Sequence, residues 1–368
     1  MTASPTWDDL PLRPELRHAE PYGAPHLDVP VCLNVNENPY APPPEVQAAI
    51  VEAVAEVATR LNRYPDREAV ELRRQLARYL GCGLEMDQMW AANGSNEIMI
   101  QILTAFGGPG RSVLTFSPSY SMYPEYARDT HTDYIEVARN SDYQITAISA
   151  LAAIEQHRPD VVVIANPNNP TGTVTDADII KQILAEAPGM VVVDEAYQEF
   201  SCLDSSLTQL PRHPRLIVTR TMSKAFAFAG GRLGYAAAAP AVIDALRVVR
   251  LPYHLSSVTQ AVAVAALNHA DLMLAQVEHL CQVRDVAIER LRGLGLTVVD
   301  TQANFFLFGP FHDRDAVWAQ LVDQGVLVRA TGPDHYLRAC VGTDDEMELF
   351  HRAVATVVAS STKGGSPQ

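Results

Sequence analysis

The stretch Val161–Gly172 reads VVVIANPNNPTG, and the prediction of the fold starts from it. Five apolar residues in a row, Val161–Ala165, indicate a strand that is covered on both faces. The segment Asn166–Gly172 follows at once, and its Asn, Pro and Gly residues favour a tight turn. A polar turn at the carboxyl end of a buried strand is where open α/β sheets bind ligands.

Similar runs on either side extend this pattern. Three further runs are rich in β-forming residues: Ser112–Phe116, Met190–Val193 and Leu216–Arg220. Two helix-like segments lie between the runs, Ala147–His157 and Asp176–Ala187. Alternating strands and helices predict an α/β fold with a doubly wound, mainly parallel sheet. We assign this domain to residues 46–265.

The flanking segments differ in composition. Residues 1–45 are rich in proline, and we expect an extended arm that packs with a smaller domain. Residues 266–368 open with a long helical pattern, Ala270–Leu294, and continue as mixed α/β, which predicts a smaller α/β C-terminal domain. Its end, 360–368, is polar and is predicted to be disordered.

Composition excludes several classes of protein. The 368 residues carry a net charge of −15, which argues against a nucleic-acid partner. The five cysteines are scattered and odd in number, so we expect free thiols in a reducing cytoplasm and no metal site. The first ten residues contain no apolar run, and no uncharged apolar stretch reaches about 18 residues, so we expect neither a signal peptide nor a membrane span.

Lysine is rare in this chain. Only Lys181, Lys224 and Lys363 are lysines among 28 basic Lys and Arg residues, and Lys224 lies in the segment TMSKAF. A chain that almost always uses Arg needs Lys where an amine must lose its proton, and a neutral amine forms a Schiff base with a carbonyl. This chemistry indicates pyridoxal 5′-phosphate (PLP). Taken alone, Lys224 is more simply interpreted as a surface lysine, so its neighbouring residues decide between that interpretation and a Schiff-base lysine.

PLP catalysis requires an acid at the ring nitrogen and donors to the phenolate oxygen. Asp194 ends the run Met190–Val193 and is the candidate acid, although a helix cap would explain it equally well in isolation. Asn169, in the turn quoted above, and Tyr197, three residues after Asp194, are candidate donors. Tyr120 is a candidate to stack on the ring, or else a packing residue.

PLP also needs a phosphate site. Gly94-Ser95-Asn96 begins a predicted helix that Ser95 or Asn96 caps, and helix N-termini bind anions. Thr221, Ser223 and Arg232 flank Lys224 and are further candidates. In the C-terminal part, Arg329 and Arg338 occupy apolar runs, which requires an anionic partner: either an Asp or Glu in a structural ion pair, or a substrate carboxylate or phosphate.

Together these residues resemble the fold-type-I PLP-dependent aminotransferases, most of all the histidinol-phosphate aminotransferases and especially their actinobacterial forms. The resemblance covers about residues 10 to 355, and the 30-position gap between Asp194 and Lys224 fits it. The segments that carry it are Leu33–Tyr40 (LNVNENPY), Arg63–Pro65, Ala92–Glu97, Pro118–Tyr123, Asn166–Gly172, Asp194–Tyr197, Arg220–Arg232, Leu337–Arg338 and Val341–Thr343. Phe228 and Gly231 depart from it, because many relatives have Leu there.

The resemblance implies roles for these residues. Lys224, Asp194 and Tyr197 are the implied catalytic residues, with Lys224 forming the Schiff base and moving the proton. The implied cofactor contacts are Ser95, Asn96, Tyr120, Asn169, Asp194, Tyr197, Thr221, Ser223, Lys224, Arg232 and Tyr64, the last from the partner subunit of a homodimer with shared active sites. The implied substrate contacts are Tyr22, Asn38, Arg329 and Arg338.

The implied reaction converts L-histidinol phosphate and 2-oxoglutarate into imidazole-acetol phosphate and L-glutamate in histidine biosynthesis. Two alternatives share the cofactor residues. One is an aromatic aminotransferase acting on phenylalanine or tyrosine, and the other is a PLP decarboxylase acting on a phosphorylated amino acid, because substrate orientation selects the bond that breaks. A non-catalytic PLP-binding module is a third, which the full set Lys224, Asp194, Asn169 and Tyr197 opposes.

Overall fold

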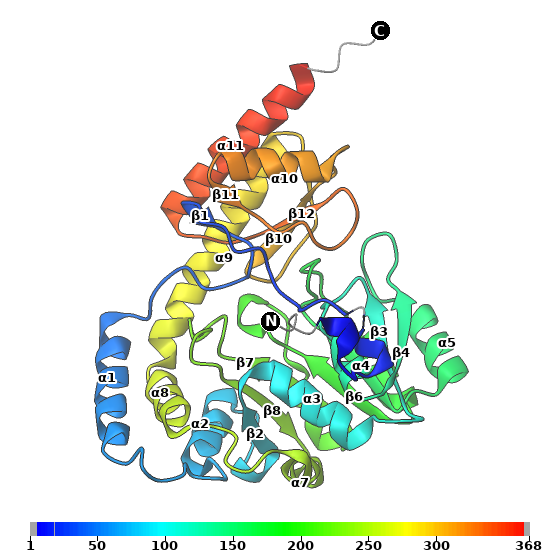
Figure 1. Cartoon of the computed structure of the whole chain (residues 1–368), viewed down its shortest axis with the longest axis vertical. Coiled ribbons are helices and arrows are strands. Elements are labelled where there is room, and N and C mark those ends of the chain that lie inside the picture. The colour runs from blue at the N-terminus through cyan, green and yellow to red at the C-terminus, as the bar shows by residue number, and fades with distance from the viewer. Residues whose placement is uncertain (1–5, 18, 364–368) are drawn as a thin grey trace.

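The computed structural model describes residues 6–17 and 19–363, and a seven-stranded sheet forms the centre of its larger lobe (Figure 1). Every pairing in this sheet is parallel except those of β8, which runs antiparallel to both neighbours. The predicted doubly wound, mainly parallel α/β fold is confirmed. In sheet order the strands are β2 (Met89–Ala92), β8 (Gly234–Ala238), β7 (Leu216–Thr221), β6 (Met190–Asp194), β5 (Val161–Ala165), β3 (Ser112–Ser117) and β4 (Asp133–Ala138).

Strand β5 shows why the central strands are apolar throughout. Val162 and Ile164 belong to a core with residues of α5 (Ala147–His157) and α6 (Ala177–Glu186). Val161 and Val163 face the opposite way and pack with residues of α3 (Gly94–Phe106), α4 (Tyr123–Asp129) and α7 (Pro240–Val249). Helices therefore cover both faces of the sheet, so neither face of a central strand meets water.

Three strands of the seven-stranded sheet were not predicted from the sequence. β8 reads GYAAA, and alanine and glycine have low β-propensity. β4 is an edge strand, and none of its side chains is fully buried. β2 has only four residues and follows a 3₁₀ turn, Met86–Gln88. Pairing in the sheet, rather than local preference, makes these segments strands.

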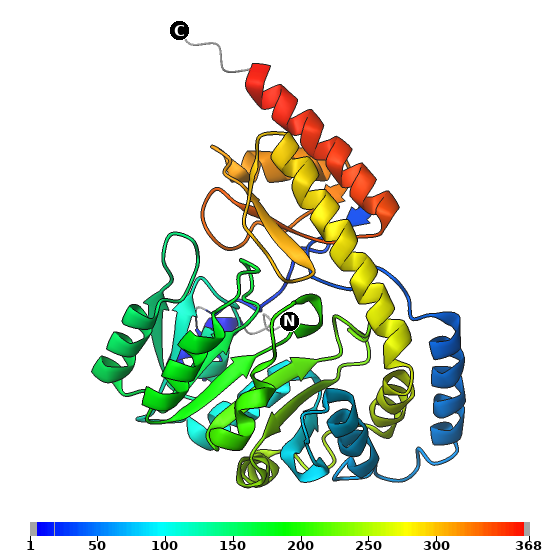
Figure 2. The same ribbon diagram turned by 180° about the vertical axis from the view of Figure 1, so that it is seen from behind.

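The smaller lobe is built on a long helix. α8 (Ser257–Leu267) is followed by α9 (Ala270–Gly293), which runs from the larger lobe into the smaller one beside α11 (Asp344–Lys363), as Figure 2 shows from behind. A three-stranded antiparallel sheet has the order β12 (Leu337–Cys340), β10 (Phe305–Gly309), β9 (Thr297–Val298), and α10 (Arg314–Asp323) completes the lobe. Its core includes ring contacts among Phe306, Phe308 and Phe350.

The N-terminal segment joins both lobes before the first long helix begins. β1 (Val31–Cys32) pairs in parallel with β11 (Val326–Leu327) of the smaller lobe. Further upstream, Arg13 hydrogen-bonds to His131, in the turn that precedes β4. The segment then continues into α1 (Pro44–Ala58), and α2 (Val70–Leu80) follows. The domain boundaries at 45 and 265 stay predictions.

The predicted disordered tail begins too early. α11 continues to Lys363, and only 364–368 of the predicted tail lie outside the described residues. A formed helix gains one backbone hydrogen bond for each residue added, so polar residues at its end are carried along. The Ser360 hydroxyl donates to the carbonyl of Val357 within this last stretch.

No single helix in the described part of the chain is long and apolar enough to cross a membrane. The pair α8 and α9 passes that test only when both helices are counted together, and they meet at a bend of 75°.

Gly234 permits the close approach of β8 to the start of α3. A Cβ atom at this position would overlap the backbone of Gly94 and Ser95. We expect Gly234→Ala to lower the free energy of unfolding by about 1–3 kcal/mol, as overpacking does. Gly293 is the matched control, because it ends α9 with open space around it, and alanine there should stabilise by up to about 1 kcal/mol. Urea unfolding midpoints measure both changes, and a Gly234→Ala protein as stable as the parent would contradict the packing argument.

Candidate active site

A cavity of about 480 Å³ opens where the carboxyl ends of β5, β6 and β7 meet the N-terminus of α3. This edge is where open α/β sheets bind ligands. The arm and the smaller lobe close its other side. The structure brings thirteen predicted site residues into the wall: Tyr22, Ser95, Asn96, Tyr120, Asn169, Asp194, Tyr197, Thr221, Ser223, Lys224, Arg232, Arg329 and Arg338.

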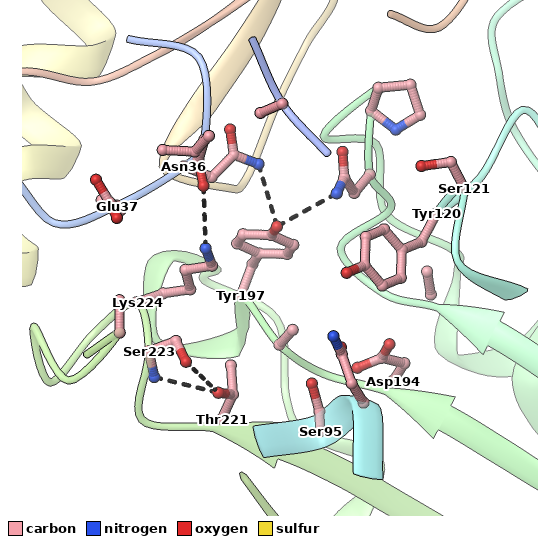
Figure 3. Close-up of a pocket in the computed structure, with 18 of the residues that line it drawn as sticks. Asn36, Glu37, Ser95, Tyr120, Ser121, Asp194, Tyr197, Thr221, Ser223 and Lys224 are labelled. Atoms are coloured by element: carbon pink, nitrogen blue, oxygen red, sulfur yellow. Dashed lines mark hydrogen bonds between the residues drawn. The ribbon is translucent and has the colours of Figure 1, made fainter. Parts of the chain in front are cut away.

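Asp194 is the last residue of β6 and lies at the bottom of the cavity, with 8% of its surface exposed (Figure 3). Its Oδ2 accepts a hydrogen bond from Tyr123 Oη at 2.8 Å, and its Oδ1 accepts one from Thr219 Oγ1 at 3.2 Å. Thr219 is its register partner on β7. Burial raises the pKa of Asp194, while the two hydroxyl donors act against that rise.

The hydroxyl of Tyr197 is hydrogen-bonded to two side-chain amides. It accepts hydrogen bonds from Asn36 Nδ2 at 3.1 Å and from Asn169 Nδ2 at 3.4 Å. Figure 3 shows both bonds converging on this oxygen. Burial raises the pKa of Tyr197 to about 12, so the hydroxyl keeps its proton at neutral pH. It therefore has a proton to donate to an anionic oxygen that enters the cavity.

Lys224 lies in the turn that follows β7, and its Nζ donates to the carbonyl of Val35 at 3.3 Å. Burial lowers the pKa of its amine to about 8, and the positive charges of Arg338 and Arg232 act in the same direction. A neutral amine is therefore accessible close to neutral pH, which a nucleophile or proton acceptor requires.

Hydroxyl and guanidinium donors gather at the N-terminus of α3. Thr221 Oγ1 donates to Ser223 Oγ at 3.0 Å, and Arg232 Nη1 donates to the same Ser223 oxygen at 3.4 Å. Ser95 and Asn96, in the first turn of α3, line the cavity beside them. Backbone N–H groups at a helix start, together with an Arg, form an anion site, and a phosphate ester fits this donor set.

The predicted cap of α3 is wrong. Neither Ser95 nor Asn96 precedes the helix, because α3 begins at Gly94 and Asn93 occupies the N-cap position. The backbone N–H of Asn93 donates to Glu97 Oε2 at 2.6 Å. Gly94 has φ +81°, a left-handed conformation that glycine adopts without strain. Ser95 and Asn96 are thereby left without a capping bond.

The two arginines predicted to bind the substrate, Arg329 and Arg338, have no carboxylate partner among the described residues. Arg338 is buried on β12; its Nη1 donates to Asn169 Oδ1 at 2.6 Å and its Nη2 to the carbonyl of Asn34 at 2.9 Å, whereas Nε has no partner. Arg329 donates to the carbonyl of Gly23 at 3.0 Å, and its Nη1 has no partner. Within 6–17 and 19–363 neither forms an ion pair, so the structural ion-pair alternative is not supported. Both line the cavity and offer positive charge to an anion.

Two predicted site residues do not reach the cavity. Asn38 is turned into its own loop, where its Oδ1 accepts from the backbone N–H of Tyr40 at 3.0 Å. Tyr64 is 79% exposed and stacks on Tyr253, with ring centroids 4.4 Å apart. Asn36, two residues earlier in the same motif, is the amide that donates to Tyr197.

The sequence analysis missed Asn36, Glu37 and Tyr123, all in the cavity wall. Asn36 and Glu37 belong to the segment LNVNENPY, where the sequence gives no sign of which amide points inward. Tyr123 lies three residues after Tyr120, and the two rings contact each other edge to face at 5.6 Å. The two residues close a turn before α4, because the backbone N–H of Tyr123 donates to the carbonyl of Tyr120, and the three-residue spacing of the two tyrosines was the available signal.

Comparison with known proteins agrees with this geometry. Residues 29–354 match the family model Aminotransferase class I and II. The chain belongs to the class I and II aminotransferases. A relative from Thermobifida fusca (strain YX), named histidinol-phosphate aminotransferase, is 56% identical to this aminotransferase, over 95% of this chain and 96% of its own. A relative of the same name from Mycobacterium avium (strain 104) is 51% identical, over 98% and 92%.

Among solved structures, a putative histidinol-phosphate aminotransferase from Erwinia carotovora atroseptica superimposes with a TM-score of 0.82 at 27% identity, over 94% of this aminotransferase and 99% of that chain. A Sinorhizobium meliloti histidinol-phosphate aminotransferase in complex with pyridoxal-5′-phosphate has the same TM-score at 24% identity, over 90% and 92%, and shows the same fold. The family resemblance expected from the motifs is confirmed.

We expect Lys224 to titrate well below an ordinary lysine when no cofactor is bound. Reductive ¹³C-methylation gives few resonances because the chain has three lysines, and the signal missing from Lys224→Arg identifies Lys224. Its midpoint should lie near pH 8 instead of the usual 10.5, because burial and nearby guanidinium groups disfavour the ammonium form. The folded chain then binds fewer protons than the unfolded chain between these values, so this group's contribution to stability rises with pH across that window. A midpoint near 10.5 would contradict the burial of the amine.

Proposed function

We propose that this aminotransferase carries out PLP-dependent transamination between L-histidinol phosphate and 2-oxoglutarate, giving imidazole-acetol phosphate and L-glutamate, in histidine biosynthesis. The names of its relatives support this choice of substrate. The observation that carries it is the pair Arg329 and Arg338, two guanidinium groups in the cavity wall with unused donors and no carboxylate partner among the described residues. A phosphate bears more charge and more acceptor oxygens than a carboxylate and uses both groups.

The donor set fits pyridoxal 5′-phosphate. Asp194 would hold its ring nitrogen, Asn169 and Tyr197 would hold its phenolate oxygen, and Tyr120 would lie against the ring. Its phosphate would be held by five residues: Ser95, Asn96, Thr221, Ser223 and Arg232. PLP, when bound, supplies an electron sink that stabilises negative charge on the substrate carbon next to nitrogen. Asp194 would support that sink by offering an acceptor to a protonated ring nitrogen, and its two hydroxyl donors favour the ionised form of this buried carboxyl group against the effect of burial.

Lys224 supplies the base. Its amine would hold the cofactor through the aldehyde, and a pKa near 8 would let a neutral Lys224 accept a proton from the substrate carbon and return it to the neighbouring position. The positive charge of Arg338 contributes to that low pKa, so the group that binds the substrate's anion also favours the neutral amine.

Arg338 lets one site accept two substrates. Glutamate offers its α-carboxylate to this guanidinium, and histidinol phosphate, which has no carboxylate, offers its phosphate. Arg329 and Tyr22 lie in the same wall, where they add a second positive charge and a hydroxyl. A bidentate Arg matches either anion geometrically.

A second copy of the chain completes the site in this proposal. Tyr64 and Tyr253 form an exposed aromatic pair outside their own cavity, 79% and 41% exposed. Aromatic residues are enriched at protein interfaces, so this exposed pair supports a homodimer in which Tyr64 reaches the partner's cofactor phosphate. The five cysteines are free thiols, and three of them are exposed, which suits a reducing cytoplasm.

For the domains we retain the predicted bounds: residues 1–45 as the arm, 46–265 as the large domain and 266–368 as the small domain.

A comparison of amino donors tests the proposed substrate. The purified protein with PLP should form glutamate from 2-oxoglutarate when L-histidinol phosphate is the donor, with a kcat/KM at least about tenfold above that for phenylalanine or tyrosine, because only histidinol phosphate engages both guanidinium groups with a phosphate. A preference for phenylalanine would favour an aromatic aminotransferase. Release of CO2 from an amino acid without glutamate formation would favour a decarboxylase.

We expect Arg338→Lys to lower kcat/KM for glutamate and for histidinol phosphate by about 100-fold, or about 3 kcal/mol, because an ammonium does not reproduce the bidentate contact. Arg290→Lys is the control, since Arg290 is an exposed side chain of α9 that pairs with Glu348 and is not part of the cavity wall. Steady-state kinetics on both substrates measure the effect. A loss for histidinol phosphate alone would show that glutamate binds elsewhere.

A further inference from the structure

Tyr123 is a buried phenol whose hydroxyl touches the carboxylate at the bottom of the active site. It is the first residue of α4, its side chain is 2% exposed, and its Oη donates to Asp194 Oδ2 at 2.8 Å. A buried hydroxyl must find a partner. Here the partner is an ionisable group of the catalytic set, instead of a backbone carbonyl.

The same ring also contacts the wall of the cavity. Tyr120, the candidate stacking residue, meets Tyr123 edge to face, with centroids 5.6 Å apart and planes at 90°. The backbone N–H of Tyr123 donates to the carbonyl of Tyr120 at 3.1 Å. One side chain is thus in contact with both groups that flank the proposed cofactor ring, Asp194 at its edge and Tyr120 at its face.

Asp194 depends on such donors. It is buried, and within the described ranges 6–17 and 19–363 no Lys or Arg forms an ion pair with it. Its ionised form is held by the hydroxyls of Tyr123 and Thr219, one on each oxygen, and by the backbone N–H of Ala196. A buried carboxylate that loses a donor takes up a proton more readily and gains freedom to rotate.

We propose that Tyr123 is a positioning residue for catalysis: its hydroxyl fixes the orientation and the ionised state of Asp194, and through Asp194 it strengthens the hold on the protonated ring nitrogen of PLP. The inference rests on the proposed function, in which Asp194 faces that nitrogen. In this scheme Tyr123 acts on the ring nitrogen only through Asp194. Its effect is therefore specific to a cofactor that has a ring nitrogen.

The test compares two cofactors. PLP and its 1-deaza analogue, in which CH replaces the ring nitrogen, are each titrated into the cofactor-free protein, and the ratio of their dissociation constants is determined for wild type and for Tyr123→Phe. We expect the preference for PLP to fall by about tenfold in Tyr123→Phe, as loss of a hydrogen bond to a charged group predicts, while binding of the analogue stays unchanged. An equal loss for both cofactors, or no loss, would overturn the proposal, because a purely structural role does not distinguish them.

Tyr126→Phe is the matched control. It makes the same change one turn further along α4, in a side chain that is 3% exposed, and its hydroxyl does not bond to Asp194. The ratio should equal that of wild type. Kinetics give a second readout: Tyr123→Phe should lower kcat for the glutamate and histidinol phosphate half-reactions by the same factor and leave KM unchanged, because both need the same electron sink.

Two further outcomes distinguish a failure of the proposal about Tyr123 from a failure of the proposed function on which it rests. If wild type itself binds PLP and the analogue equally, Asp194 does not act on the ring nitrogen, and the premise fails before Tyr123 is considered. If Tyr123→Phe does not fold, 3-fluorotyrosine at position 123 alone keeps the ring and makes its hydroxyl a stronger donor. The preference for PLP should then equal or exceed that of wild type, and a tenfold fall would overturn the proposal.

Discussion

Asp194 is a buried carboxylate that relies on neutral donors, and the surrounding architecture follows from that requirement. Removing a charge from water costs free energy unless hydrogen bonds replace the lost hydration. Those bonds come from three places: Thr219 on the adjacent strand β7, Tyr123 at the start of α4, and the backbone at Ala196. The parallel register that sets Asp194 beside Thr219 is therefore part of the active site as well as of the fold.

The positive groups lie on the other side of the cavity and influence one another. Lys224 and Arg338 are both desolvated, and the charge of Arg338 helps to keep the Lys224 pKa near 8. Burial lowers the pKa of Arg338 as well, but a guanidinium stays charged at neutral pH. The arrangement thus gives each residue type the state its chemistry allows: Arg remains a cation that binds anions, and Lys becomes a base. This division accounts for the choice of Lys at position 224 in a chain that otherwise prefers Arg.

The sequence predicted the parts of this arrangement that local pattern controls. β5 and α5 have the predicted bounds, because an apolar run before a Pro- and Asn-rich turn and an amphipathic helix are both local signals. Residues named by motif also reached the cavity wall in most cases. What the sequence did not decide depends on contacts between distant segments. Only the fold shows that Asn36, and not Asn38, is the amide of LNVNENPY that meets Tyr197. β8 was missed because it is a strand by virtue of its partners.

Arg338 shows how far the site depends on the joining of separate segments. Its strand β12 belongs to the smaller lobe, yet its guanidinium donates to Asn169 in the larger lobe and to the backbone of Asn34 in the N-terminal arm. Asn169 donates in turn to Tyr197. These acceptors are neutral, so they orient the guanidinium without cancelling its charge, and Nε stays unused. An ion pair in the same place would have held the lobes together more simply, but it would have left no net charge for an anion. Neutral acceptors position the group while preserving the charge that substrate binding needs.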